Sequence, residues 1–118
     1  MALALALAEQ HQAAVCLLYV AAEPVAASDP VPEWQERLQY RLYRLGETWF
    51  EGKVPFEVAI WSGDPASAII GAARASGADL IVIATRRRGL DRVLLGSVAN
   101  RVVRESPVPV LTIRPKAS

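Results

Sequence analysis

Four apolar runs of strand length alternate along the chain with segments that carry helix signals. The runs are Ala14–Val20, Pro55–Trp61, Asp79–Ala84 and Val108–Ile113. Each run follows a helical segment, so the predicted order is α-β-α-β-α-β-α-β. Strands that alternate with helices pair in parallel through right-handed crossovers, which places helices on both faces of the sheet. The sequence therefore predicts an α/β fold with a mostly parallel sheet.

Local residue choices predict where the helices begin and end. Asp64 followed by Pro65 is a helix-start signal, because an Asp side chain caps free N–H groups and Pro suits the first turn. Gly77 is suited to end that helix. Residues 2–12 are rich in Ala and Leu, which favours a helix. The alternating leucines of this segment also fit a strand, and that alternative stays open.

Apolar stripes predict which helix faces are buried. The stripe of the second helix consists of Trp34, Leu38, Leu42, Leu45 and Trp49. It recurs at spacings of three and four residues, which places it on one face. A row of arginines at 37, 41 and 44 is expected to be solvated. In the last helix, Val98, Val102 and Val103 are expected to face inward.

Composition limits the classes of function. At 118 residues the chain is expected to form one domain, residues 1–118. The formal charge of +1 gives the whole molecule no electrostatic reason to bind nucleic acid or an anionic membrane. No apolar run approaches the ~18 residues of a membrane span. Cys16, the single cysteine, lies in an apolar run and is expected to be buried, as in a reduced, cytoplasmic protein.

An arginine-rich polar loop follows the strand at 79–84, and a helix start at Gly96-Ser97 follows the loop. The first N–H groups of a helix lack partners within it and carry a partial positive charge, so anions bind there. We therefore expect a phosphate or sulfate ion, when one binds, at the N–H groups of Ser97 and Val98. The loop arginines are expected to form a charged surface, with no nucleic acid bound.

Four segments together resemble the universal stress protein family in order and spacing. They are residues 62–70, 77–83, 94–103 and 107–113, and the resemblance runs from about residue 1 to 114. It implies a Rossmann-like fold of the adenine nucleotide alpha hydrolase-like type. By this resemblance, the adenosine pocket would be lined by Val20, Ile83 and Ala84. The phosphates would be met by Arg87, Gly96, Ser97 and Val98.

The loop departs from the pattern of that family, in which Gly, two residues, Gly, nine residues and Gly-(Ser/Thr) follow one another. Ala84 and Arg87 stand in place of the first two glycines, and 8 residues separate Arg87 from Gly96. Glycine lets backbone N–H groups approach phosphate because no Cβ intervenes. Weak or no ATP binding is therefore expected. The alternative is that ATP or another adenine nucleotide binds and acts as a switch.

The beginning of the chain also departs from the family pattern, which places a central strand ending in a Val-Asp-Gly-Ser-like turn there. This sequence lacks that first central strand, and its aspartate with it. Buried strand edges left unpaired would each cost roughly 1–3 kcal/mol per polar group. Three alternatives remain. The chain is N-terminally truncated, the two halves close up, or residues 1–8 take the place of the strand.

The function expected from these features is a non-catalytic module in the stress response, not an enzyme. The single histidine, His11, is expected on a helix surface, and no grouping of residues has metal-ligand spacing. The resemblance implies a homodimer through the last strand, Val108–Ile113. Independently, an apolar strand at the chain end would leave an exposed edge for pairing.

Overall fold

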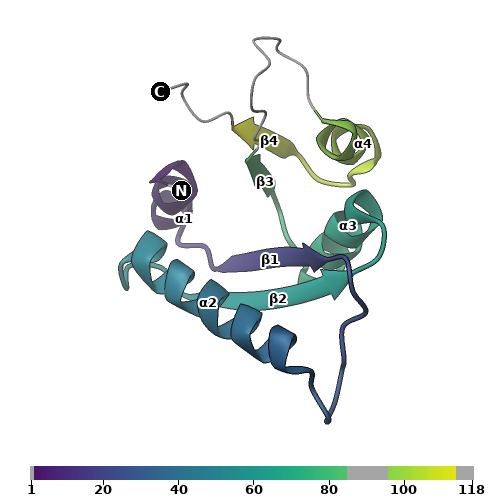
Figure 1. The fold of residues 1–118 in the computed structure, drawn as a ribbon. Helices are drawn as coiled ribbons and strands as arrows, with labels where there is room; N and C mark the ends of the chain where they lie inside the picture. The colour runs from purple at the N-terminus through teal and green to yellow at the C-terminus, as the bar shows by residue number, and fades with distance from the viewer. Residues whose placement is uncertain (1, 85–95, 114–118) are drawn as a thin grey trace, which may run out of the picture. The chain divides into compact units, whose positions relative to one another are not determined.

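The computed structural model of the chain describes residues 2–84 and 96–113. Helices and strands alternate in the predicted order, four of each, as Figure 1 shows. The chain divides into two compact units, with the division between Gly63 and Asp64. All the strand pairing that the structure describes is parallel, within each unit. The predicted α/β class is therefore confirmed.

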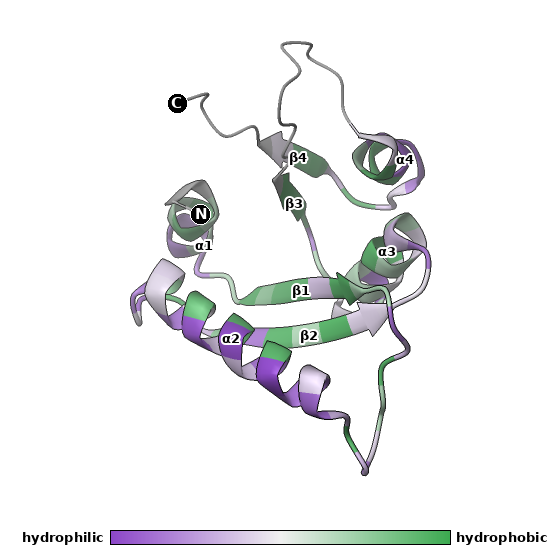
Figure 2. Ribbon diagram, viewed as in Figure 1, coloured by the Kyte–Doolittle hydropathy of each residue, from purple (hydrophilic) through white to green (hydrophobic). Residues whose placement is uncertain are grey.

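The first unit contains α1 (Ala2–His11), β1 (Val15–Ala21), α2 (Glu33–Phe50) and β2 (Phe56–Ser62). The ladder between β1 and β2 runs from the pair Val15–Phe56 to the pair Ala21–Ser62. Figure 2 shows both strands as mostly hydrophobic, whereas α2 carries hydrophilic residues between its apolar positions. This pattern is the one expected of a helix that packs one face against a sheet.

Aromatic side chains dominate the core of the first unit. Phe50 is 1% exposed and its ring lies 5.6 Å from that of Phe56, centroid to centroid. The Tyr43 ring lies 5.4 Å from the Phe56 ring, centroid to centroid. Gly46 is required beside this cluster, because a Cβ at that position would overlap the Phe56 ring. In the α2–β2 contact, the Phe56 ring therefore occupies the space that a side chain at position 46 would fill.

The second unit contains α3 (Pro65–Ser76), β3 (Ile81–Ala84), α4 (Ser97–Glu105) and β4 (Val110–Ile113). Its ladder pairs Ile81 with Val110 and Ala84 with Ile113. The core is aliphatic, with no aromatic ring among its buried members. Its buried members are Ala66, Ile70, Ala73, Ile81 and Val102. The predicted helix start at Asp64 and helix end at Gly77, which has a φ of 65°, are confirmed.

The described strands form two sheets of two strands each, β1-β2 and β3-β4. Residues 2–11 form α1, so the helix prediction for this segment is confirmed and these residues do not replace a central strand. Whether the chain is N-terminally truncated or its halves close up stays open. Whether residues 1–118 behave as one domain stays a prediction.

Three burial predictions are wrong. Cys16 is exposed rather than buried, and it lies opposite Glu57 in the β1–β2 ladder. Val103 is 44% exposed and Leu45 is 37% exposed, although both belong to apolar stripes. For Leu45 and Val103, the apolar stripe is broader than the neighbouring element that covers it, so the residue at the margin of the stripe reaches solvent. Leu42 and Val102, nearer the centre of each stripe, are buried as expected.

Candidate functional site

The two helices that start in the second unit differ in how their free N–H groups are satisfied. Asp64 caps α3, and its carboxylate accepts hydrogen bonds from the Ser67 N–H at 3.1 Å and the Ser67 hydroxyl at 2.8 Å. Gly96 is the N-cap of α4, with extended backbone, and makes no side-chain cap. The first turn of α4 is closed by the Asn100 N–H, which donates to the Gly96 carbonyl at 2.9 Å. Within residues 2–84 and 96–113, α3 therefore begins with a carboxylate cap and α4 begins without a side-chain cap.

We call the backbone N–H groups of Ser97 and Val98 the anion seat. They belong to the first turn of α4, where an N–H group has no carbonyl partner within the helix. Ser97 is exposed, and Val98 is half-buried against the aliphatic core of the unit. That packing anchors the first turn of α4 to the core of the unit. The arrangement is chemically suited to an anion, which the partial positive charge of the helix end would attract.

The predicted site residues are distributed over both units. Val20 is the sixth residue of β1 in the first unit, and the other described ones lie in the second. Ile83 and Ala84 are the last two residues of β3, and Ile83 packs against the same core cluster as Val98. Gly96, Ser97 and Val98 share the start of α4. Arg87 lies outside the described residues. Of the predicted residues, Ile83 of β3 and Val98 of α4 thus pack against one core cluster.

An ionic network that the sequence prediction did not include lies beside this helix start. The Arg101 guanidinium of α4 donates from Nη1 to Oδ2 of Asp64, at the cap of α3. Its Nη2 donates to the Ser67 hydroxyl oxygen at 3.0 Å, and its Nε donates to Glu105 at 3.1 Å. Only the pair of Arg101 and Glu105, four residues apart on one helix, is readable from sequence spacing. Asp64 and Arg101 are 37 residues apart, and no local pattern joins them.

The network shifts the pKa values of its members. Hydrogen bonds from the hydroxyl and the N–H of Ser67, together with the Arg101 guanidinium, lower the pKa of Asp64 below its ordinary value. The hydrogen bonds to Glu105 and Asp64 raise the pKa of Arg101. Both shifts favour the charged forms, so the carboxylate and the guanidinium are ionised together at neutral pH.

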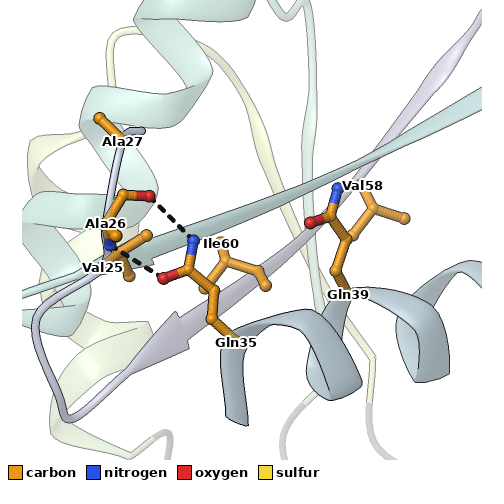
Figure 3. Close-up of a pocket in the computed structure, with 7 residues that line it drawn as sticks. All are labelled: Val25, Ala26, Ala27, Gln35, Gln39, Val58 and Ile60. Carbon is orange, nitrogen blue, oxygen red and sulfur yellow. Dashed lines mark hydrogen bonds between the residues drawn. The ribbon is translucent and has the colours of Figure 1, made fainter. Parts of the chain in front are cut away.

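A groove of about 330 Å³ lies in the first unit, as Figure 3 shows. Its lining residues are Val25, Ala26, Ala27, Gln35, Gln39, Val58 and Ile60. Among the described residues, Gln35 is the one polar residue that is buried, with 7% of its surface exposed. Its amide accepts from the Ala26 N–H at 2.8 Å and donates to the Ala26 carbonyl at 2.9 Å. We call these two hydrogen bonds the amide latch, and they hold the segment after β1 against α2. None of the predicted site residues lines the groove.

Residues 2–84 and 96–113 hold no group of three or more His, Cys, Asp or Glu side chains arranged to bind a metal ion. His11 is the last residue of α1 and is exposed. None of the helices in these same ranges combines the length and the apolar character needed to cross a membrane.

Comparisons with known proteins agree on one family. The model of the universal stress protein family matches residues 1–114. A universal stress protein from Thermus aquaticus is 40% identical over 119 residues, which span 96% of this chain and 86% of the relative. The family match over residues 1–114 and the 40% identity to this relative both exceed what a shared fold alone requires. Together they establish that the two proteins are related.

Solved structures support the same fold. A universal stress protein in complex with cAMP superposes with a TM-score of 0.68 at 24% identity, covering 96% of this chain and 82% of the other. A family member from Arabidopsis thaliana with AMP bound has a TM-score of 0.61 at 27% identity, covering 90% of this chain and 66% of the other. The predicted Rossmann-like architecture is thereby confirmed.

Proposed function

Because the chain belongs to the universal stress protein family, we propose that it is a non-catalytic, cytoplasmic module of the stress response that binds ATP weakly or not at all. The observation that carries the proposal is the contrast within the second unit. The start of α4 retains an anion seat, whereas the β3 end that precedes the loop bears Ala84 where the family pattern has glycine. A phosphate group can therefore bind at the start of α4. The loop, however, lacks the glycines that would let backbone N–H groups surround a triphosphate.

The anion seat is supported by the way α3 and α4 begin. The carboxylate of Asp64 already occupies the positive end of α3, so an anion there would meet a like charge. Gly96 offers no such competitor at α4 and has no Cβ to obstruct the approach of phosphate. We therefore propose that phosphate or sulfate binds at Ser97 and Val98. Ala84 and Arg87 would hinder the further contacts that a triphosphate needs.

A second candidate function is a switch that responds to an adenine nucleotide. It is favoured by the relatives solved with cAMP and with AMP bound. In this version Val20, Ile83 and Ala84 would contact adenosine, and Arg87, Gly96, Ser97 and Val98 would contact phosphate. A monophosphate demands fewer backbone contacts than ATP, so AMP is the more suitable ligand for a loop with reduced glycine content.

Calorimetric titration with ATP and AMP separates the two functions. The proposal expects an ATP Kd far weaker than micromolar, near the 1 mM that corresponds to about 4 kcal/mol of binding free energy. The double variant Ala84→Gly/Arg87→Gly should bind ATP more tightly, because it restores both glycines. The matched control Ala84→Gly/Arg88→Gly removes the same charge at a position outside the motif. Micromolar ATP binding by the unaltered chain would refute the proposal and favour the switch.

The seat itself is tested at Ser97, the first residue of α4. Pro is tolerated at this helix position but has no N–H group, so Ser97→Pro should remove a phosphate ligand without breaking the helix. Ser97→Ala keeps the N–H group and serves as the control. Phosphate binding is followed by the ¹⁵N–¹H shifts of the Val98 amide. Equal phosphate affinity in both variants would exclude the Ser97 N–H group as a ligand.

We also propose a homodimer through residues 108–113. β4 pairs with β3 along one edge, and in the described residues its other edge has no strand partner. A twofold antiparallel contact would satisfy both edges at once. Val110 packs against the core of its own unit, so Leu111→Lys is the better probe, with Val103→Lys on exposed α4 surface as control. Light scattering should report a monomer only for Leu111→Lys, and a dimeric Leu111→Lys variant would place the interface elsewhere.

A further inference from the structure

The groove of the first unit has no ionisable side chain among its lining residues. Val58 and Ile60 of β2 give it apolar surface, and Gln35 and Gln39 of α2 give it two amide groups (Figure 3). A charged ligand would find no opposite charge among these residues to offset the loss of its hydration. The groove is therefore suited to a neutral ligand that combines apolar surface with hydrogen-bonding groups.

The amide latch shows which neutral group this face of α2 holds. Gln35 accepts from the N–H group of Ala26 at 2.8 Å and donates to the carbonyl group of the same residue at 2.9 Å. A side-chain amide carries an acceptor beside a donor, so it matches the N–H and C=O groups of one extended residue. Two paired residues of an antiparallel ladder exchange hydrogen bonds in the same way. An amide on this face can therefore pair with the backbone of a peptide.

Gln39 repeats this amide one turn further along α2. Residues four apart on a helix are neighbours on its surface, and Figure 3 shows both glutamine side chains extending from α2 in the same direction. Both residues line the groove. Gln39 is exposed, and within residues 2–84 and 96–113 its amide makes no hydrogen bond. The groove thus contains a second amide of the kind that holds Ala26, with its donor and its acceptor both open.

We propose that the groove binds a neutral, apolar peptide segment, and that Gln39 holds one residue of it as Gln35 holds Ala26. The Gln39 amide accepts from the N–H group of that residue and donates to its carbonyl group. The apolar side chain of the residue lies against Val58 and Ile60, which are both half-buried in the groove. This peptide site lies within the first unit, so it does not depend on the phosphate site proposed at the start of α4.

The experiment titrates N-acetylvaline N′-methylamide, a single valine capped at both ends, into the full ¹⁵N-labelled chain. This neutral probe presents one N–H and C=O pair, and it should shift the side-chain amide of Gln39 and the backbone amides of Ala27 and Val58 until they saturate. An analogue methylated at the valine nitrogen lacks that N–H group and should bind about fivefold more weakly, because one hydrogen bond is lost. Salt should leave the affinity unchanged, since the probe carries no charge.

A matched pair of variants tests the role of Gln39. Gln39→Leu removes both hydrogen bonds and should weaken binding of the probe by about tenfold. Gln10→Leu makes the same change at an exposed position of α1 outside the groove and should leave the affinity unaltered. The proposal is overturned if the shifts do not saturate, if they lie outside the groove, or if Gln39→Leu binds as well as Gln10→Leu. Should Gln39→Leu fold poorly, equal affinities of the unaltered chain for the two probes would overturn it.

Discussion

The two units fasten their helices with opposite chemistry. In the first unit, a neutral amide that is 7% exposed holds the segment after β1 against α2 through two hydrogen bonds to Ala26. In the second, a charged guanidinium that is 37% exposed joins α4 to the cap of α3. Breaking the hydrogen bonds of a buried neutral amide lowers the free energy of unfolding, and this contribution does not depend on salt or pH. An exposed ionic network is weak but responds to both.

The contrast extends to the cores. Phe50 and Phe56 give the first unit large rings, whereas alanines and aliphatic side chains fill the second. Large rings must be accommodated by the backbone, as Gly46 shows beside Phe56. In the second unit, Arg101 of α4 bonds to Asp64 and Ser67 at the start of α3. The two units thus differ both in the side chains of their cores and in the polar interactions that hold their segments together.

The largest expected effect comes from the aromatic core. Phe50→Ala should lower the free energy of unfolding by about 3–5 kcal/mol, because the ring is 1% exposed and its loss leaves a cavity. Val102→Ala, the equivalent change in the second unit, removes less buried apolar surface and should cost less. Urea denaturation of the two variants measures the difference. An equal loss in both would show that ring size does not distinguish the cores.

The amide latch should have the next largest effect. Gln35→Leu leaves the N–H and carbonyl groups of Ala26 without their partners, and an unsatisfied buried polar group costs about 1–3 kcal/mol. The loss should be the same in low and high salt, since no charge is involved. Gln39→Leu changes an exposed residue on the same groove and is the control. If the two substitutions destabilise the protein equally, the latch does not contribute to stability.

The smallest expected effect is the acid sensitivity of the ionic network. The pKa of Asp64 is lowered in the folded chain, so its contribution to stability is complete above the unfolded pKa of about 3.9 and is lost as pH falls through the lower folded value. In that window, Asp64→Asn should lose less stability than the unaltered chain does. Thermal melts across the acid range provide the measurement. Parallel pH profiles for the two proteins would contradict this account.

The elements were predictable where their signals are local. Asp64, Pro65 and Gly77 fix the ends of α3 through backbone conformation and short-range hydrogen bonds, and the structure has them in those roles. The parallel pairing followed from the alternation of helices and strands. Burial was less predictable, because an apolar stripe does not reveal how wide a neighbour covers it. The predicted burial of Leu45 and Val103 was wrong for this reason.

The candidate site was predictable only in part. Gly96, Ser97 and Val98 are adjacent in the sequence, so their common place at the start of α4 needed no long-range information. The bonds of Arg101 to Asp64 and of Gln35 to Ala26 depend on how the chain folds back on itself. Arg and Gln also occur at many solvated helix positions, so the residue type alone does not identify those that make such bonds.

The β1–β2 register has a consequence for the reactivity of the chain. Cys16 is the single sulfhydryl of the protein, and it is exposed at a position opposite Glu57. Partial burial, together with the negative charge of Glu57, raises its pKa, so the thiolate is scarce at neutral pH. Since the thiolate is the form that oxidants and alkylating reagents attack, Cys16 combines access with low nucleophilicity. It offers a single attachment point for a spectroscopic label, and modification will proceed more readily as the medium becomes more alkaline.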